Sequence, residues 1–119
     1  MLKATIKNLN DVFALKQKTL DYIYPGFSWS KDYPTKETFK NDINKGELYL
    51  FYKQDTLIGV VCLNEEYDEH YNYVIWHSQK PALIIHRLFI DPQFRGKHLG
   101  EEILKWVIRY AINNKYKSI

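Results

Sequence analysis

The spacing of apolar and polar residues predicts secondary structure along most of the chain. Residues 2–7 fit a short first strand. Asn10 and Asp11 then cap a helix whose apolar positions recur at helical spacing. Pro25 and Gly26 end this pattern. The chain is therefore predicted to open with a strand followed by a helix.

A second helix and a hairpin of strands are predicted next. Thr35 is a capping residue for a short helix that ends near Gly46. Residues 47–53 and 57–63 have strand-like composition and are separated by the short polar segment 54–56. A connection of this length predicts an antiparallel hairpin.

The last helix, predicted over residues 99–113, has the clearest amphipathic pattern. Its apolar positions fall on one broad face, which is expected to bury against a sheet. That face carries Leu99, Ile103, Trp106, Val107, Tyr110 and Ala111, and Glu101, Glu102, Lys105, Arg109 and Asn113 lie opposite.

A strand and a basic, glycine-containing loop precede this helix. Residues 82–90 form an apolar run that predicts a strand buried on both faces, and Pro92 ends it. Gly96 and Gly100 then bracket Arg95, Lys97 and His98, so unpaired backbone N–H groups and positive charge meet where the helix begins. Phosphate is the ligand that this arrangement favours.

Residues 95–100, after this strand, resemble the acetyl-CoA signature of the GNAT superfamily of N-acyltransferases, whose loop reads Gln/Arg-x-x-Gly-x-Gly/Ala. Arg95 and Gly100 match the first and last positions, but His98 stands where the family usually has its middle glycine. The resemblance implies that the loop amides hold the pyrophosphate of acetyl-CoA and that the preceding strand pairs with the pantetheine arm. The cofactor-binding residues implied in this way are Leu88, Phe89, Ile90, Arg95, Gly96, Lys97, His98, Leu99 and Gly100.

The order of predicted elements is similar to that of the same family over nearly the whole chain. It implies a single domain over residues 1–119 of class α/β (α+β), with a GNAT-like acyl-CoA N-acyltransferase fold and a mixed central sheet between helices. Family members usually continue with further strands, so we expect the usual C-terminal strands to be lacking here. An open edge on strand 82–90 and exposure of Trp106 and Tyr110 would then favour a homodimer.

Transfer of an acetyl group to an amine needs a base for the amine and a donor for the oxyanion of the thioester carbonyl. Glu65 and Glu66, at the end of the second hairpin strand, and His86, within strand 82–90, are the candidate catalytic residues. Each also has a structural interpretation: adjacent carboxylates at a strand end commonly belong to a solvated turn, and a strand histidine is commonly a hydrogen-bonded core residue. Residues 64–81 are a candidate substrate-facing loop.

Composition narrows the function further. The chain has 17 basic and 14 acidic residues, and a net charge of +3 is too small to require a nucleic-acid partner. Cys62 is the single cysteine and is expected to be a core thiol. The histidines lack the regular spacing of metal ligands, so no metal is expected. Neither a membrane-spanning run nor a signal-peptide pattern is present, so we expect a cytoplasmic protein without membrane attachment.

Three classes of function remain, in order of preference. The first is an acetyl-CoA-dependent N-acetyltransferase that acts on a primary amine of a small molecule or a protein. The second is a non-catalytic CoA-binding or interaction module derived from the same fold. The third is a single-stranded nucleic-acid binder with basic residues between aromatic ones, as at residues 115–117, but acidic residues interrupt the other such clusters.

Overall fold

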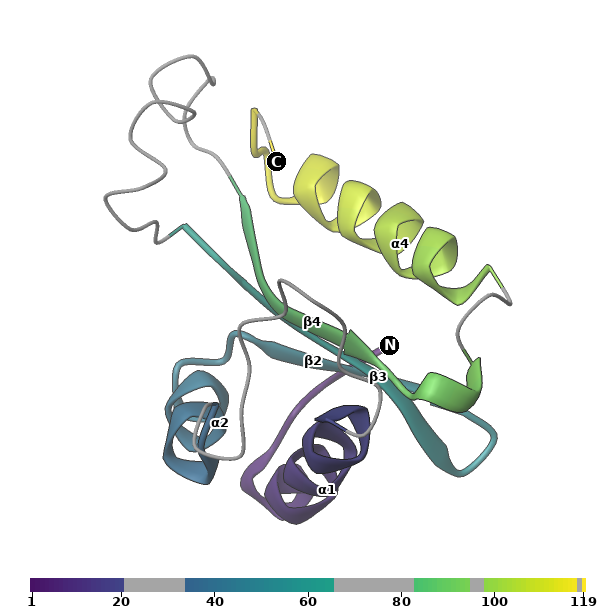
Figure 1. The fold of residues 1–119 in the computed structure, drawn as a ribbon. Coiled ribbons are helices and arrows are strands. Elements are labelled where there is room, and N and C mark those ends of the chain that lie inside the picture. Colours follow the sequence, from purple (N-terminus) through teal and green to yellow (C-terminus); the bar gives the residue numbers. More distant parts are fainter. Residues whose placement is uncertain (21–33, 66–82, 95–97, 118) are drawn as a thin grey trace.

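The computed structural model of the chain describes residues 1–20, 34–65, 83–94, 98–117 and 119. In this part of the chain, one sheet of four strands lies between two layers of helix (Figure 1). The strands are β1 (Leu2–Lys3), β2 (Leu48–Lys53), β3 (Thr56–Asn64) and β4 (Ile84–Ile90). The helices are α1 (Leu9–Leu20), α2 (Lys36–Asn44) and α4 (Leu99–Asn113), with the short 3₁₀ turns η1 (Ile6–Asn8) and η3 (Pro92–Phe94).

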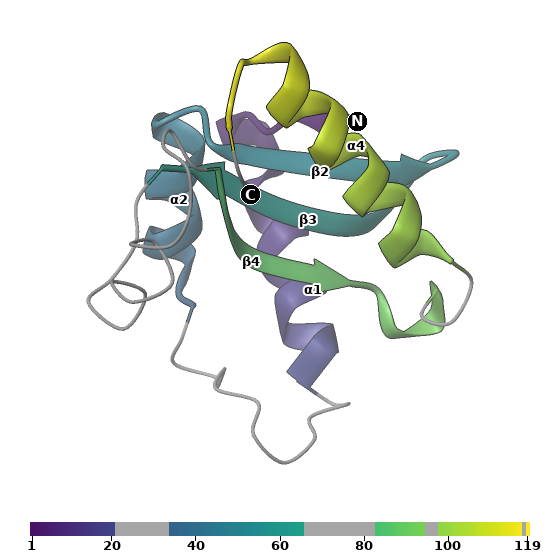
Figure 2. The same ribbon diagram turned by 90° about the horizontal axis from the view of Figure 1, so that it is seen from above.

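The strands lie in the order β1-β2-β3-β4, and each neighbouring pair is antiparallel. β2 and β3 form the predicted hairpin, but Lys53 pairs with Thr56, so the turn holds two residues rather than three. Gln54 in this turn has a φ of 56°, the left-handed conformation that such short turns require. β4 is the end strand of the described sheet (Figure 2).

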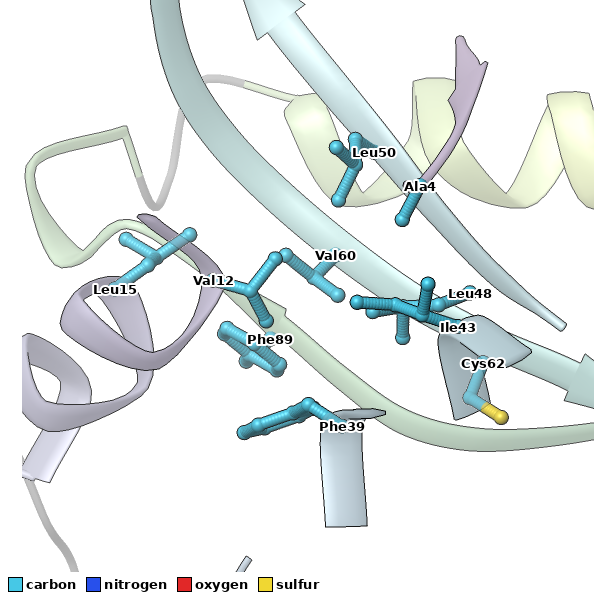
Figure 3. Close-up of a cluster of buried hydrophobic side chains, with 10 residues drawn as sticks. All are labelled: Ala4, Val12, Leu15, Phe39, Ile43, Leu48, Leu50, Val60, Cys62 and Phe89. Carbon is cyan, nitrogen blue, oxygen red and sulfur yellow. The ribbon is translucent and has the colours of Figure 1, made fainter. Parts of the chain in front are cut away.

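Helices cover both faces of the sheet, as the sequence predicted. α1 and α2 lie on one face and α4 on the other (Figures 1 and 2). Beneath α1 and α2, ten buried residues form one apolar cluster, in which the rings of Phe39 and Phe89 lie 5.8 Å apart (Figure 3). Beneath α4, a second cluster joins Ile103 and Val107 to Val61 of β3.

The boundaries of α2 and α4 agree with the predicted ones. The Thr38 N–H donates to the Thr35 side chain at 3.1 Å at the start of α2, and Gly46, with a φ of 70°, follows its end. α4 spans the predicted residues 99–113 and turns its apolar face to the sheet. Among the described residues, no helix is long and apolar enough to cross a membrane.

Two strand predictions are wrong. The first strand ends at Lys3, because Thr5 and Asn8 form a capping box that turns the chain into η1. β4 is not buried on both faces: Leu88 is exposed and most of its other side chains are half-buried. The reason is that no strand of the described residues pairs with its outer edge.

The exposed part of α4 also differs from the expected one. The rings of Trp106 and Tyr110 each pack on Tyr49 of β2, at 5.5 Å between centroids, so they are not left exposed. Three other apolar side chains reach solvent instead, and we call them the α4 stripe. They are Leu104, Ile108 and Ile112, which are 46%, 48% and 67% exposed.

Candidate functional site

β4 contains a β-bulge. Two residues of this strand, Arg87 and Leu88, face the single residue Val61 of β3. Arg87 has a φ of 46°, a left-handed conformation that is uncommon for a residue with a side chain. Bulges are frequent next to active sites because they redirect a strand locally.

The apolar residues of β4 explain why one extra residue is accommodated. Ile85 belongs to the cluster beneath α4, whereas Phe89 belongs to the cluster beneath α1 and α2. Residues four apart lie on the same face of a regular strand. Both side chains therefore reach their layers only because the bulge lies between them.

The outer edge of β4 presents backbone groups that could bind an extended ligand. The N–H of Asp91 donates to the carbonyl of Ile58 at 2.8 Å, so it points toward β3. N–H groups of successive strand residues point to alternate edges, so those of Leu88 and Ile90 point outward. A ligand with amide groups can hydrogen-bond to such an edge in the manner of an added strand.

A buried ion pair joins the bulge to α2. The Arg87 guanidinium donates from Nε to Oδ2 of Asp42 at 2.7 Å and from Nη2 to Oδ1 at 2.6 Å. The two side chains are only 18% and 6% exposed, so water screens their attraction weakly. Sequence analysis did not find this pair, since no pattern connects an arginine in a strand with an aspartate in a distant helix.

Cys62 lies beside this ion pair and is the core thiol that the sequence predicted. Its side chain is fully buried, and Nη2 of Arg87 lies 3.5 Å from its sulfur. Burial raises the pKa of the Cys62 thiol to about 12, and the charge of Asp42 adds to this effect while Arg87 opposes it. The protonated thiol is a poor nucleophile at neutral pH. Asp42, Glu47 and Cys62 bring three possible metal-ligand atoms within 4.8 Å of one another, but the Arg87 guanidinium supplies positive charge there.

A second ion pair fixes the chain where it leaves β4. The Lys18 ammonium donates to Oδ2 of Asp91 at 2.8 Å, and the N–H of Gln93 donates to Oδ1 at 2.9 Å. The N–H of Phe94 donates to the Asp91 carbonyl, which closes η3. These bonds direct the chain from β4 toward the start of α4.

The predicted phosphate loop is described only in part. Arg95, Gly96 and Lys97 lie outside the described residues. His98 precedes α4 with a φ of 62°, and its side chain is 81% exposed. It therefore takes the backbone conformation that glycine favours, with its ring turned to solvent.

Two features at the start of α4 act in opposite directions on a bound phosphate. A β-carbon on Gly100 would meet only Ile90 Cδ1 among the described atoms, at 3.9 Å, so packing does not require glycine there and a ligand can approach the backbone. Glu101 and Glu102 place negative charge in the first turn, which favours the helix but opposes an anion. Leu99 is half-buried and packs in the cluster beneath α4.

The candidate catalytic residues occupy different places. His86 is half-buried in β4, opposite Cys62 and two residues before Leu88. Glu65 is exposed just after β3, and its charge adds to the effect of burial in raising the pKa of Tyr116, at the far end of α4. Glu66 and nearly all of the predicted substrate-facing loop lie outside the described residues.

A cavity of about 390 Å³ lies between the β2–β3 hairpin and α4. Aromatic rings of Phe51, Phe94 and Trp106 line it, together with the charged side chains of Lys53 and Arg109. Sequence analysis did not predict this cavity, because its lining comes from β2, β3, η3 and α4, together with Met1.

Comparisons with known proteins agree with this fold. Residues 13–119 match the model of the acetyltransferase (GNAT) family. Over 66 residues, the chain is 30% identical to YesJ, an uncharacterized N-acetyltransferase of Bacillus subtilis (strain 168); the match covers 54% of this chain and 36% of that protein. The chain thus matches about a third of the length of this curated relative.

Solved structures share the fold. A candidate acetyltransferase from Staphylococcus aureus Mu50 superposes with a TM-score of 0.75 at 22% identity, over 97% of this chain and 73% of that one. A GNAT-family acetyltransferase from Streptococcus agalactiae 2603 gives 0.73 at 20% identity, over 92% and 67%. The PaiA N-acetyltransferase of Thermoplasma acidophilum, solved in complex with coenzyme A, gives 0.70 at 17% identity, over 96% and 72%.

Proposed function

We propose, from the premise that this chain belongs to the acetyltransferase (GNAT) family, that it binds acetyl-CoA and transfers the acetyl group to a primary amine of a small molecule or a protein. The observation that carries the proposal is a path of described elements in chain order, namely the outer edge of the end strand β4, then η3, then the N-terminus of α4. This path offers backbone hydrogen bonds and then a helix terminus. CoA carries an amide-containing arm and a pyrophosphate in that order.

Each part of CoA has a proposed binding segment. The outward N–H of Ile90 would bond a pantetheine amide, the N–H of Leu88 would face the thioester carbonyl, and the buried ring of Phe89 holds the strand between them. Residues 95–100 would bind the pyrophosphate through their backbone amides and through the charges of Arg95 and Lys97. Among the described atoms, nothing lies closer than 3.9 Å to a β-carbon placed on Gly100, which supports close approach of the phosphates to the backbone.

The proposed acetyl transfer uses groups at the bulge and close to it in β4. In the transfer step, the amine nitrogen bonds to the thioester carbonyl carbon, the carbon–sulfur bond breaks, and CoA leaves as a thiolate that takes up a proton. The N–H of Leu88 is the proposed donor for the oxyanion. His86 is the first candidate for the base that takes the proton from the amine, because it lies in the same strand as Leu88. Glu65 and Glu66 are the other candidates.

The second candidate function is a CoA-binding or interaction module without transfer activity. It is favoured by the places of the described candidate catalytic residues, since His86 is half-buried in β4 and Glu65 is exposed just after β3. Such a module would use the same edge of β4 and the same helix terminus. It would differ only in lacking turnover.

We also propose a homodimer in which the α4 stripe is covered by a second copy. Trp106 and Tyr110 pack over β2 on one flank of α4, so the stripe on the other flank lies on the side of β4. An exposed apolar row beside the proposed CoA site favours an interface there. The outer edge of β4 would then stay open for CoA in each copy.

Calorimetric titration with acetyl-CoA at low and high salt tests the proposed function. We expect binding that weakens with salt, since charge-assisted contacts to phosphate are screened. The double variant Arg95→Gln/Lys97→Gln should lose affinity, whereas the control Lys105→Gln, on the exposed face of α4, should keep it. No binding at low ionic strength contradicts the proposal. Binding without acetyl transfer to any amine of a broad panel favours the non-catalytic module.

A further inference from the structure

We propose that the Arg87–Asp42 ion pair holds the β4 bulge in its left-handed form and thereby aims the Leu88 N–H at the acyl group of bound acyl-CoA. Arg87 and Asp42 are then positioning residues, which touch neither the acyl group nor the amine. The inference rests on the proposed function, because it requires acyl-CoA to lie along the outer edge of β4.

The conformation of Arg87 needs a cause beyond the bulge itself. Ile85 and Phe89 pack into the layers on opposite faces of the sheet, which explains why β4 contains one extra residue between them. They do not explain its φ of 46°, because the extra residue of a bulge can also adopt the right-handed helical conformation. The left-handed form is normally filled by glycine, and an arginine there is strained.

The ion pair supplies this cause, because both of its partners are fixed. The guanidinium forms two parallel bonds with Asp42, and its planar fork cannot turn without breaking one of them. The backbone of Asp42 is itself anchored, since its carbonyl accepts the N–H of Glu47 at 3.0 Å. The contact of Nη2 with Cys62 adds a third point of attachment. The direction in which the Arg87 side chain leaves the strand is therefore set from the α2 layer.

The direction of the Arg87 side chain determines the orientation of the Leu88 N–H. The backbone torsions at residue 87 orient the peptide plane between residues 87 and 88, and that plane carries the Leu88 N–H. A change from left-handed to right-handed conformation at residue 87 would turn this plane and move the donor. The pair in the α2 layer thus acts on the outer edge of β4 through one peptide unit.

Nuclear magnetic resonance of the full chain tests the inference with two variants and a control. Arg87→Met removes the guanidinium, and Arg87→Met/Asp42→Leu removes both charges, so that no carboxylate is left buried and unpaired if the single variant fails to fold. The control, Lys18→Met, removes the other ion pair between the helical layer and the end of β4. The readouts are the φ of residue 87, from coupling constants and chemical shifts, and the response of the Leu88 amide to acetyl-CoA.

We expect residue 87 to keep a positive φ in the wild type and in Lys18→Met and to take a negative φ in the double variant. The Leu88 amide should respond to acetyl-CoA in the wild type, and this response should fall several-fold in the double variant while that of Gly100 persists. A positive φ at residue 87 in the double variant overturns the inference. A wild-type response at Gly100 but not at Leu88 also overturns it and leaves the proposed function standing. If acetyl-CoA causes no response at all, the proposed function and the aiming of Leu88 both fail, and the φ comparison alone decides whether the pair holds the bulge.

Discussion

The ammonium of Lys18 lies 2.8 Å from Oδ2 of Asp91, and this bond ties α1 to the residue at which β4 ends. Asp91 is 4% exposed, so its carboxylate depends on protein donors for hydrogen bonds. Among the described residues it has two such donors, the ammonium and the N–H of Gln93, and the second opens η3. One buried side chain thus joins the α1 layer, the end of β4 and the loop that leads to α4.

Replacing Asp91 with alanine should destabilise both the fold and the loop. The N–H of Gln93 and the Lys18 ammonium would lose their acceptor, which costs about 1–3 kcal/mol for a buried partner. Urea denaturation should show this loss, and amide exchange should quicken at Gln93 and Phe94. Asp55→Ala, in the exposed hairpin turn, is the control and should change the free energy of unfolding by less than about 0.5 kcal/mol. Equal effects of the two variants would contradict this role of Asp91.

Replacing His98 with glycine should stabilise the protein. His98 has a φ of 62°, and glycine adopts this conformation without the strain of a β-carbon, so we expect a gain of about 0.5–1 kcal/mol. Gly46→Ala, at a φ of 70°, is the matched control of opposite sign and should destabilise. Thermal unfolding measures both. An unchanged or lower melting temperature for His98→Gly would mean that the ring makes a compensating contact.

The same variant decides what the histidine does for CoA. The ring is exposed at the start of α4, so a ring N–H can donate to the phosphates. We expect His98→Gly to bind CoA more weakly than the wild type in calorimetric titration, because glycine lacks this donor. Tighter binding by the variant would show instead that the histidine obstructs the site.

The helices were predictable because their signals are local. The Thr35 cap and the amphipathic pattern of residues 99–113 are contained within single segments of sequence, and the structure agrees with both. The first strand was overestimated because the hydrogen bonds between Thr5 and Asn8 compete with strand pairing. The spacing of apolar residues alone does not reveal this competition.

The sequence indicated where a phosphate site is expected but not the geometry of the strand beside it. The order of strand, basic loop and helix indicated a phosphate site, whereas the bulge depends on which layer each apolar residue of β4 enters. Likewise, Arg87 and Asp42 are 45 positions apart, and only the fold brings them together. The burial of β4 was overestimated because a run of apolar residues does not reveal whether a strand has one neighbour or two.

Replacing Glu101 with glutamine should tighten CoA binding while weakening the helix. Its carboxylate lies in the first turn of α4, where it repels phosphate but complements the positive end of the helix dipole. We expect a several-fold gain in affinity at low salt, with a loss of about 0.3–1 kcal/mol in stability. Calorimetry and urea denaturation provide the two values. Lys105→Gln serves as the control, and a loss of affinity in Glu101→Gln would contradict phosphate binding at this helix end.

Stability should fall at alkaline pH. Burial raises the pKa of the Cys62 thiol from 9.0 to about 12 and also raises the pKa of the Tyr49 hydroxyl. At a pH between the two pKa values of the thiol, the unfolded state binds fewer protons than the native state. The contribution of these buried groups to the free energy of unfolding is therefore greatest below pH 9 and falls as pH rises. We expect Cys62→Ala to be less stable overall but to lose stability less steeply, by up to about 1.4 kcal/mol per pH unit. Identical slopes for the two proteins would contradict the buried thiol.

The α4 stripe should hold a dimer together. Leu104, Ile108 and Ile112 are spaced by one helical turn, so two copies of α4 can cross in opposite directions with Ile108 at the two-fold axis. Leu104 of one copy would then meet Ile112 of the other.

This arrangement separates the dimer contact from the CoA site, which makes it testable. Ile108→Asp would bury two like charges at the axis, so we expect sedimentation equilibrium to give the monomer mass of 14.3 kDa for this variant and twice that mass for the wild type. Lys105→Gln should remain dimeric.

CoA should not dissociate the wild-type dimer, because the outer edge of β4 stays open when the stripes pair. If the β4 edges paired instead, CoA and the second copy would compete for the same N–H groups, and added CoA would lower the dimer fraction. A wild-type protein of 14.3 kDa at micromolar concentration would contradict both arrangements.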